Sequence, residues 1–510
     1  MSTPEREPEL TRRRVVGRGL AGALVLVTGG CGSQRDRATS TVATTPRTTT
    51  VPPPKRRRAL SPLKELARDV RGPVRQPRSS AALVFNERFA ERRPRVVVQP
   101  RDVRDVQQAV RWAQRHDVAL TVRSGGHSYE GYSSIDGGLV LDLRRLRAVH
   151  VTRGRALVGG GAQVIDVHAQ LARRNATLPT GSCPSIGVGG LTLGGGFGLS
   201  GRAHGLTCDN VTGLTIVTPD GRLRRCDARS HEDLFWACRG GGGGNFGVVT
   251  SFEFKTHPAR RGAWFAISWP WGQADAALAA WQRVAPHTAN ALTSVLDLGS
   301  HAGAPSIGAR GQYLGRESQL RALLRPLTEV AGAALATGSE GSFALAKRWA
   351  GCADLGRGAC DTTGASQPTA RFAAGSAYVE RALDAQGRAA ILSAVERPHP
   401  GAGMLILDAY GGAINDVAAD ATAFVHRSPL FSVQILTYFG PEGIDAAMSW
   451  KRSVERRLRP HASGAAYQNY IDRDLRGWQQ AYYGRNLPRL REIRAHVDPE
   501  NLLRFPQSIR

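Results

Sequence analysis

Few residues of this chain carry sulfur, and those residues lack the spacing of a metal site. The 510 residues include three methionines and only 6% aromatic residues. The seven cysteines are Cys31, Cys183, Cys208, Cys226, Cys238, Cys352 and Cys360. No two of them form a CxxC pair, so we expect no structural zinc and no other metal. The motif GxxxxGK[ST] is also missing, which excludes a P-loop protein.

The N-terminal apolar run, Leu20 to Val27, is far too short to cross a bilayer as a helix. It follows the pair Arg12-Arg13 and precedes the small residues that lead to Cys31, which is the order of a twin-arginine export signal. We expect this signal over residues 1–31, with lipid attachment at Cys31. The mature protein would then be extracellular or tethered to the cell surface. The alternative is a chance group of arginines before a disordered tail.

The positive charge is concentrated near the N-terminus. The net charge is +26, and the first 80 residues hold 17 basic against 6 acidic residues. Residues 32–80 are rich in threonine, proline and arginine, so we expect a disordered tether there. Basic surfaces bind nucleic acid, anionic lipid or polyanionic sugars, but no zinc-finger spacing or array of interleaved basic and aromatic residues supports nucleic acid. A solvated, arginine-rich surface is the simpler interpretation.

The folded part has an α+β pattern. Apolar residues at helical spacing predict a helix over 102–115, and apolar runs predict strands at 118–122 and 139–143. After residue 258, alanine-rich helices at 274–284 and 320–331 alternate with strands at 404–410 and 431–438. This predicts a second sheet backed by helices, as in a substrate-side domain. Cys352 and Cys360, eight residues apart in a glycine-rich loop, could form a disulfide after export.

Three glycine-rich segments carry the functional signal. Residues 181–198 contain Cys183 and seven later glycines, and residues 123–129 place His127 directly after two glycines. Glycine at this density lets the backbone approach another molecule closely. The third segment, 242–247, matches GxGxxG, but a strand over 248–254 follows it instead of a helix. That context excludes a Rossmann site, although its backbone N–H groups could still cradle a pyrophosphate.

These segments, with residues 205–210 and the tail from Tyr467 to Ile509, together resemble the berberine-bridge-enzyme-like FAD-linked oxidoreductases of the vanillyl-alcohol-oxidase superfamily. The resemblance covers about residues 83–510 and is weakest from about 260 to 400. It implies a two-subdomain FAD-binding domain of the PCMH type over 81–258 and a substrate domain with a large antiparallel sheet over 259–463. A C-terminal segment, 464–510, would return to the FAD-binding domain.

The resemblance also implies bicovalent FAD. The family's histidine, here His127, bonds to the flavin 8α-methyl carbon, and its cysteine, here Cys183, bonds to ring carbon C6. Such tethers would suit an exported protein that could not easily replace a lost cofactor. The other implied cofactor-binding residues are Arg123, Ser124, Gly125, Gly126, Ser128, Gly187, Gly189, Gly190, Gly194, Gly195, Gly198, Asn245, Gly247, Val249 and Asn469.

The implied reaction is oxidation of an alcohol, a carbohydrate or a secondary metabolite, by hydride transfer to flavin N5. Cavity positions correspond to Tyr129, Phe197, Gln434, Gln468 and Tyr470. The family's alternative bases, a Glu or a Tyr, are replaced here by Gln434 and Phe197, which leaves Tyr470 as candidate base if nearby donors stabilise its phenolate. The alternative is that Tyr470 only orients the substrate.

Ile186 corresponds to the family position that guards oxygen access, where a larger aliphatic residue slows reaction with O2. The sequence therefore allows either O2 or another compound as the electron acceptor. The alternative function is a non-catalytic, surface-tethered protein on the same scaffold that binds polyanions. The presence of both His127 and Cys183 argues against it.

Overall fold

In the computed structural model, the described residues are 61–301, 304–353, 360, 369–397 and 401–510. The predicted export signal, the lipid site at Cys31 and the tether up to residue 60 lie outside them. Among the described residues, no helix has the length and apolarity needed to cross a membrane. The same residues contain no group of acidic, histidine and cysteine side chains that could hold a metal.

The tether predicted through residue 80 is wrong for its last part. Residues Pro62–Asp69 form helix α1, and Val74–Arg75 form strand β1, which pairs with strand β2. Leu66 of α1 is fully buried, and the carbonyl of Pro62 accepts a hydrogen bond of 2.7 Å from the Trp112 indole. The buried leucine of this short amphipathic helix attaches the segment to the folded part of the chain. The overall composition of residues 32–80 does not indicate such a helix.

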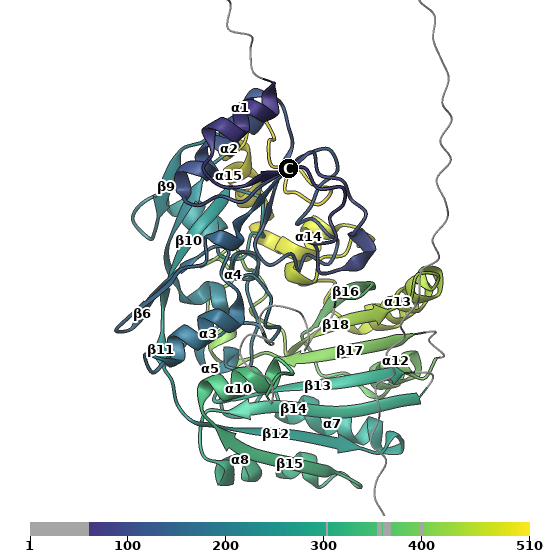
Figure 1. The fold of residues 1–510 in the computed structure, drawn as a ribbon. Helices are drawn as coiled ribbons and strands as arrows, with labels where there is room; N and C mark the ends of the chain where they lie inside the picture. The colour runs from purple at the N-terminus through teal and green to yellow at the C-terminus, as the bar shows by residue number, and fades with distance from the viewer. Residues whose placement is uncertain (1–60, 302–303, 354–359, 361–368, 398–400) are drawn as a thin grey trace, which may run out of the picture. The chain divides into compact units, whose positions relative to one another are not determined.

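Two sheets form the N-terminal half (Figure 1). The first has the order β1-β2-β4-β3, and β2, β4 and β3 run parallel. The second is antiparallel with the order β5-β6-β10-β8-β9. Their remaining strands are β2 (Val96–Val98), β3 (Leu120–Arg123), β4 (Leu139–Asp142), β5 (Val149–Thr152), β6 (Arg155–Gly159), β8 (Val211–Val217), β9 (Leu223–Cys226) and β10 (Val248–Lys255). A further pair joins β7 (Ala176–Thr177) to β11 (His257–Pro258).

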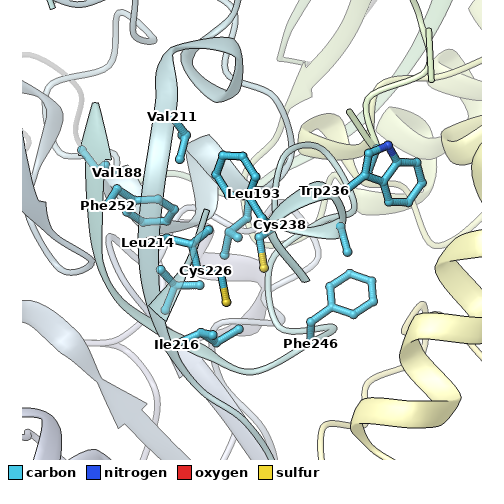
Figure 2. Close-up of a cluster of buried hydrophobic side chains, with 14 of the residues drawn as sticks. Val188, Leu193, Val211, Leu214, Ile216, Cys226, Trp236, Cys238, Phe246 and Phe252 are labelled. Carbon is cyan, nitrogen blue, oxygen red and sulfur yellow. The ribbon is translucent and has the colours of Figure 1, made fainter. Parts of the chain in front are cut away.

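Figure 2 shows the apolar core of the second sheet. Leu214 and Ile216 of β8 pack with Phe252 of β10 and with residues from the helices beside the sheet. Cys226 and Cys238 are buried in the same cluster, and burial raises the pKa of the Cys226 thiol to about 12. These thiols are therefore apolar core residues at neutral pH, and the reactive candidate, Cys183, lies elsewhere.

A seven-stranded antiparallel sheet forms the other half, with the order β15-β12-β14-β13-β17-β18-β16 (Figure 1). Its strands are β12 (Gly262–Trp269), β13 (Leu292–His301), β14 (Ala304–Tyr313), β15 (Ala334–Glu340), β16 (Phe372–Val379), β17 (Ala402–Ala409) and β18 (Phe431–Tyr438). Alternate residues of β18, Phe431, Val433 and Ile435, pack into a core with helices on one face. The opposite face carries Gln434 and Asp408 toward the N-terminal half. The predicted α+β fold with its large antiparallel sheet is thus confirmed.

The helices agree closely with the predicted ranges, with one exception. The helix predicted over 320–331 is two short helices, α8 and α9, because Pro326 begins a new helix at its second position. The helices are α2 (Val103–Arg115), α3 (Val164–Ala172), α4 (Val188–Leu193), α5 (Gly201–His204), α6 (Glu232–Ala237), α7 (Ala274–Val284), α8 (Glu317–Leu323), α9 (Arg325–Thr328), α10 (Ser342–Trp349), α12 (Ala385–Val395), α13 (Ile444–Leu458), α14 (Trp478–Tyr483) and α15 (Leu487–Val497).

The C-terminal helices α14 and α15, yellow in Figure 1, lie among the segments of the N-terminal half. The carbonyl of Leu502 accepts a hydrogen bond from the backbone N–H of Leu120 at 3.4 Å. The backbone N–H of Ile509 donates to the Asn245 side chain at 3.0 Å. The chain end is therefore part of the same core as strand β3, which leads directly into the His127 loop.

Candidate active site

A cavity of about 890 Å³ lies between the glycine-rich loops and the face of the seven-stranded sheet that carries Asp408 and Gln434. Loops that contain residues 124–129, 181–191 and 243–249 supply one wall. The sheet wall comes from β13, β14, β16, β17 and β18, and residues 467–471 close one side. This volume is at the upper end of the range of about 300–1,000 Å³ that is common for ligand sites.

The buried guanidinium of Arg123 holds the His127 loop from behind. It donates to the carbonyl of Leu83 at 2.7 Å, to the carboxylate of Asp142 at 3.0 Å and to the carbonyl of Gly125 at 3.3 Å. Arg123 does not line the cavity. Arg123 therefore fixes the conformation of the loop, and the residues that follow it line the cavity.

The His127 and Cys183 loops are in backbone contact. A Cβ atom at Gly125 would lie 2.2 Å from the backbone nitrogen of Gly187, and one at Gly187 would lie 2.1 Å from that of Gly125. Both distances are impossible for any other residue, so glycine at both positions allows the loops to cross. The crossing brings Ser185 to His127, where the hydroxyl and Nε2 are 2.9 Å apart.

His127 is held as a neutral imidazole. Its ring stacks on Phe85, with centroids 4.1 Å apart and planes inclined by 18°. Burial, with a smaller contribution from Arg123, lowers the pKa of His127 to about 3. A neutral ring keeps a nitrogen lone pair at every physiological pH, so His127 can act as a nucleophile. Cys183 lines the same cavity.

The residues that line this cavity fit a flavin with a pyrophosphate tail. A Cβ atom at Gly190 would meet no other atom within 4 Å, and one at Gly243 would meet only the Gly190 Cα atom, at 3.8 Å. Glycine is therefore not required there by protein packing, and the open space beside both backbones can hold another group. The buried Oε1 atom of Gln468, which also lines the cavity, has no hydrogen-bond partner among the described residues. A bound polar molecule would provide one.

Tyr129, at the end of the His127 loop, lies side by side with Tyr470. Their rings stack with centroids 5.7 Å apart and planes inclined by only 3°. The Gln434 amide donates a hydrogen bond of 2.5 Å to the Tyr129 hydroxyl. Burial raises the pKa of both phenols well above the ordinary value, so neither is ionised at neutral pH.

Asp408 is the functional candidate that sequence reasoning missed. It lies on β17, is 4% exposed, and accepts hydrogen bonds from Tyr470 at 3.2 Å and from Ser432 at 3.1 Å. Burial raises the pKa of its carboxyl to about 7, although the Ser432 hydroxyl and the Arg310 guanidinium act in the opposite direction. The donors expected beside the Tyr470 phenol are therefore replaced by an acceptor. A carboxylate that titrates near neutral pH can take the phenolic proton.

The cavity brings most of the predicted site residues together. All six predicted catalytic and pocket residues line it: Tyr129, Ile186, Phe197, Gln434, Gln468 and Tyr470. Thirteen of the predicted cofactor-binding residues also line it: Ser124, Gly125, Gly126, His127, Ser128, Cys183, Gly187, Gly189, Gly190, Gly198, Gly247, Val249 and Asn469. Arg123, Gly194, Gly195 and Asn245 do not. Asn245 instead ties the Gly241 carbonyl to Ile509 from behind the cavity.

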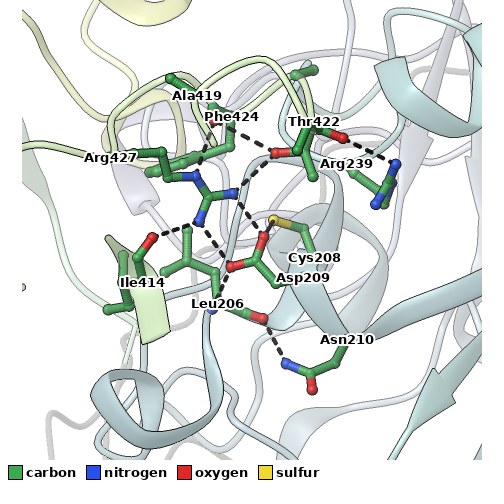
Figure 3. A network of polar contacts seen from close by, with 12 residues as sticks. Leu206, Cys208, Asp209, Asn210, Arg239, Ile414, Ala419, Thr422, Phe424 and Arg427 are labelled. Atoms are coloured by element: carbon green, nitrogen blue, oxygen red, sulfur yellow. Dashed lines mark hydrogen bonds and ion pairs between the residues drawn. The ribbon is translucent and has the colours of Figure 1, made fainter. Parts of the chain in front are cut away.

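A buried ion pair supports the segment that follows Phe197 (Figure 3). Arg427 donates to both carboxylate oxygens of Asp209, at 2.8 and 2.7 Å, and both side chains are less than a tenth exposed. Asp209 accepts from the backbone of Leu206, and the adjacent backbone N–H of Thr207 donates to the carbonyl of Gly196. This network fixes the turn that carries Phe197 into the cavity.

Cys352 and Cys360 form a disulfide in the structure, as the sequence spacing suggested. Both residues are buried and pack with Ile165 of α3 and Phe343 of α10. Because Trp349 and Gly351 line the cavity just before Cys352, the bridge anchors one of its margins.

Two family descriptions match the chain. "FAD binding domain" matches residues 94–227, and "Berberine and berberine like" matches residues 466–510. The first match contains His127 and Cys183, and the second contains Gln468 and Tyr470. The two ends of the chain that build the cavity therefore each match a known sequence family.

Full-length relatives extend these matches across the chain. The chain is 33% identical over 426 residues to the uncharacterised FAD-linked oxidoreductase YgaK of Bacillus subtilis, which covers 82% of this chain and 92% of the relative. It is 30% identical over 438 residues to a chitooligosaccharide oxidase of Gibberella zeae, which covers 82% and 87%. The structure of wild-type BBE-like 1 from Physcomitrella patens superposes with a TM-score of 0.82 at 28% identity, covering 88% of this chain and 99% of that chain.

Proposed function

Because this chain belongs to the berberine-bridge-like FAD-linked oxidoreductases, we propose that it oxidises an alcohol with FAD held covalently by His127 and Cys183. One observation carries the proposal: the hydrogen-bonded pair of Tyr470 and Asp408 lines the same cavity as both of these nucleophiles. A proton acceptor and two anchoring side chains thus share one enclosed space.

The contacts of His127 support a specific point of attachment. Ser185 engages Nε2, so Nδ1 is the ring nitrogen that would bond to the flavin 8α-methyl carbon. The depressed pKa of His127 keeps the ring neutral, and Nδ1 carries the lone pair in the tautomer whose Nε2–H donates to Ser185. The crossing at Gly125 and Gly187 holds the Cys183 loop against the His127 loop, so the Cys183 sulfur would reach ring carbon C6 of the same cofactor.

Tyr470 and Asp408 would move the substrate proton. When bound, the flavin supplies a two-electron acceptor for the hydride of the carbinol carbon. Tyr470 would accept the substrate hydroxyl proton as its own phenolic proton passes to Asp408. This order avoids a free phenolate, which the raised pKa of Tyr470 disfavours. Tyr129, fixed by Gln434 and stacked on Tyr470, would help to orient the substrate.

The electron acceptor and the location belong to the same proposal. Ile186 lines the cavity and would restrict access of O2 to the reduced cofactor. The proposal therefore includes both O2 and a different compound as candidate electron acceptors. The twin-arginine signal and Cys31 would place the mature enzyme outside the cell, with or without lipid. The chitooligosaccharide oxidase relative supports a carbohydrate as one class of substrate, and other metabolite alcohols form the second.

Anaerobic reduction of the flavin tests this function. The purified full chain is mixed with a panel of sugars and alcohols without oxygen, and flavin absorbance is followed. We expect at least one alcohol to bleach the flavin, and O2 or a quinone to restore its absorbance. A protein that binds polyanions in a salt-sensitive way, with no bleaching by any alcohol, would instead support the non-catalytic alternative.

A further inference from the structure

A second cavity adjoins the one described above, beside the segment that leads to Cys183. Its volume is about 330 Å³, at the lower end of the range common for ligand sites. Helices α3, α5 and α10, which lie next to one another in Figure 1, supply much of its lining. The residues that matter for a ligand there are His168, Thr180, His204, Gln312, Ala346 and Trp349.

The two cavities share a thin wall. Gly181, Ser182 and Trp349 line both of them, whereas Cys183 lines only the first. A Cβ atom at Gly181 would have no neighbour closer than 3.4 Å, which is an ordinary van der Waals contact. Packing therefore does not require glycine at this position, and its effect is to leave the wall only one backbone thick. A ligand in the second cavity would lie directly behind the proposed anchor of the flavin.

The second cavity offers hydrogen-bond groups that have no partner. Gln312, which is 8% exposed, accepts the Trp349 indole N–H on Oε1 at 2.8 Å, and its Nε2 group has no partner among the described residues. His168 Nε2 lies 2.7 Å from the Thr180 hydroxyl, and Nδ1 is likewise unpaired within the described part of the chain. When the Thr180 hydroxyl donates to Nε2, Nδ1 carries the proton and can donate. These two donors favour a ligand that supplies acceptors.

The remaining lining disfavours a cation and suits a flat, neutral molecule. Of the described residues that line the second cavity, none is acidic, and Arg260 is the only arginine or lysine. Burial lowers the pKa of His168 to about 4 and also lowers the pKa of His204, so both rings are neutral at pH 7. The His204 ring stacks on His257 with centroids 3.9 Å apart. Together with the Trp349 indole, these rings provide planar surfaces for a planar ligand.

We propose that the second cavity binds a quinone, which takes up the electrons of the reduced flavin through the wall at Gly181 and Ser182. The inference rests on the proposed function and identifies the chemical class of its electron acceptor. A quinone is planar and has two acceptor carbonyls and no donor, which matches the groups at Gln312 and His168. The alcohol loses two electrons and two protons to become a carbonyl compound, and the quinone gains two electrons and two protons to become a hydroquinone.

Binding of duroquinone to the oxidised, flavin-containing full chain tests the site directly. Its four methyl groups leave no ring position for a thiol to add to, and their NMR signal broadens when the molecule binds. Ala346→Phe fills the second cavity, and Gln312→Glu removes the amide donor but keeps an acceptor for Trp349. We expect each substitution to weaken binding about tenfold or more. Ala344→Phe, at an exposed position of the same helix outside both cavities, should bind as the wild type does.

Reoxidation of the flavin tests the electron transfer. The flavin is reduced without oxygen by one equivalent of dithionite and is then mixed with duroquinone or with O2 in a stopped-flow instrument. At low duroquinone concentration the rate follows the affinity, so Ala346→Phe and Gln312→Glu should slow this reaction about tenfold or more. Their reoxidation by O2 should stay at the wild-type rate, because O2 would reach the flavin past Ile186 in the first cavity.

The outcomes separate this inference from the proposed function. Duroquinone binding that neither substitution weakens, or that a reactive alcohol displaces, overturns the second site. Binding there that does not reoxidise the flavin, or equal slowing with duroquinone and O2, overturns its role as the acceptor site. If no alcohol reduces the flavin, the proposed function fails, whereas the dithionite experiment still decides the quinone site. If Ala346→Phe does not fold, Gln312→Glu decides it.

Discussion

Replacing Asp408 by asparagine should make the protein more stable and much less active. The carboxyl titrates at about 7 in the folded protein, against an ordinary value of 3.8. This difference of about three units corresponds to about 4 kcal/mol, at 1.36 kcal/mol per unit. Because the folded-state pKa is the higher one, the folded protein holds a proton between pH 4 and 7 that the unfolded chain has released. Stability therefore falls as the pH rises through this window.

Asparagine has no proton to lose, so Asp408→Asn removes this loss of stability. We expect the variant to exceed the wild type by as much as about 4 kcal/mol in unfolding free energy at pH 8, and to match it near pH 4. Its amide oxygen can still accept the Ser432 hydroxyl. Loss of a general base costs about 10²- to 10⁴-fold, so anaerobic flavin reduction should slow by that factor. The wild-type rate should rise with pH through about 7, whereas the variant rate should not.

Two measurements on the flavin-containing protein check this prediction. Urea unfolding at pH 4 and pH 8 gives the stability difference, and stopped-flow flavin reduction from pH 5 to 9 gives the rate. Asp420→Asn, at an exposed position outside the cavity, serves as the matched control and should resemble the wild type in both. The reasoning is refuted if Asp408→Asn keeps the wild-type rate and pH profile, or if its stability advantage is the same at both pH values.

Two further substitutions test how the site is supported. Asp209→Asn leaves the Arg427 charge buried without its partner and should destabilise the protein by about 3–5 kcal/mol. Glu253→Gln, in an exposed pair with Arg225, should cost at most about 1 kcal/mol, and equal urea midpoints for the two variants would contradict this. In Gly190→Ala the new Cβ atom would have no protein atom within 4 Å, so the variant should fold normally. Because this Cβ atom would occupy space proposed for the cofactor, the ratio of flavin to protein absorbance should fall. Gly440→Ala, equally open but outside the cavity, should keep the wild-type ratio.

The sequence predicted many of the residues on the glycine-loop side of the cavity because its signals are local. Glycines close to His127 and Cys183 in sequence are also close to them in space, so motif and site coincide. The contact between Gly125 and Gly187 joins two such motifs, and each motif showed only that some close approach was needed. The helices and strands were predicted where the apolar period was regular. The division of the predicted 320–331 helix into two helices depends on the single residue Pro326, which the periodicity of apolar residues does not take into account.

The substrate side could not be predicted because its residues meet only through the sheet. Asp408 is a single charge in an apolar strand, a visible signal, but its partner Tyr470 lies 62 residues later. Strand register decides that Asp408 faces the cavity with Ile406 and Met404, and sequence alone does not fix register. The burial that moves its pKa to about 7 likewise depends on the whole fold.

Acid denaturation of the purified full chain tests the central claim most directly. If His127 and Cys183 both hold FAD, the yellow colour and the added mass of the cofactor stay with the precipitated polypeptide. Either His127→Ala or Cys183→Ala alone should retain flavin through the remaining bond, and only the double variant should release it into the supernatant. Release of the flavin from the wild-type protein in acid would contradict the claim.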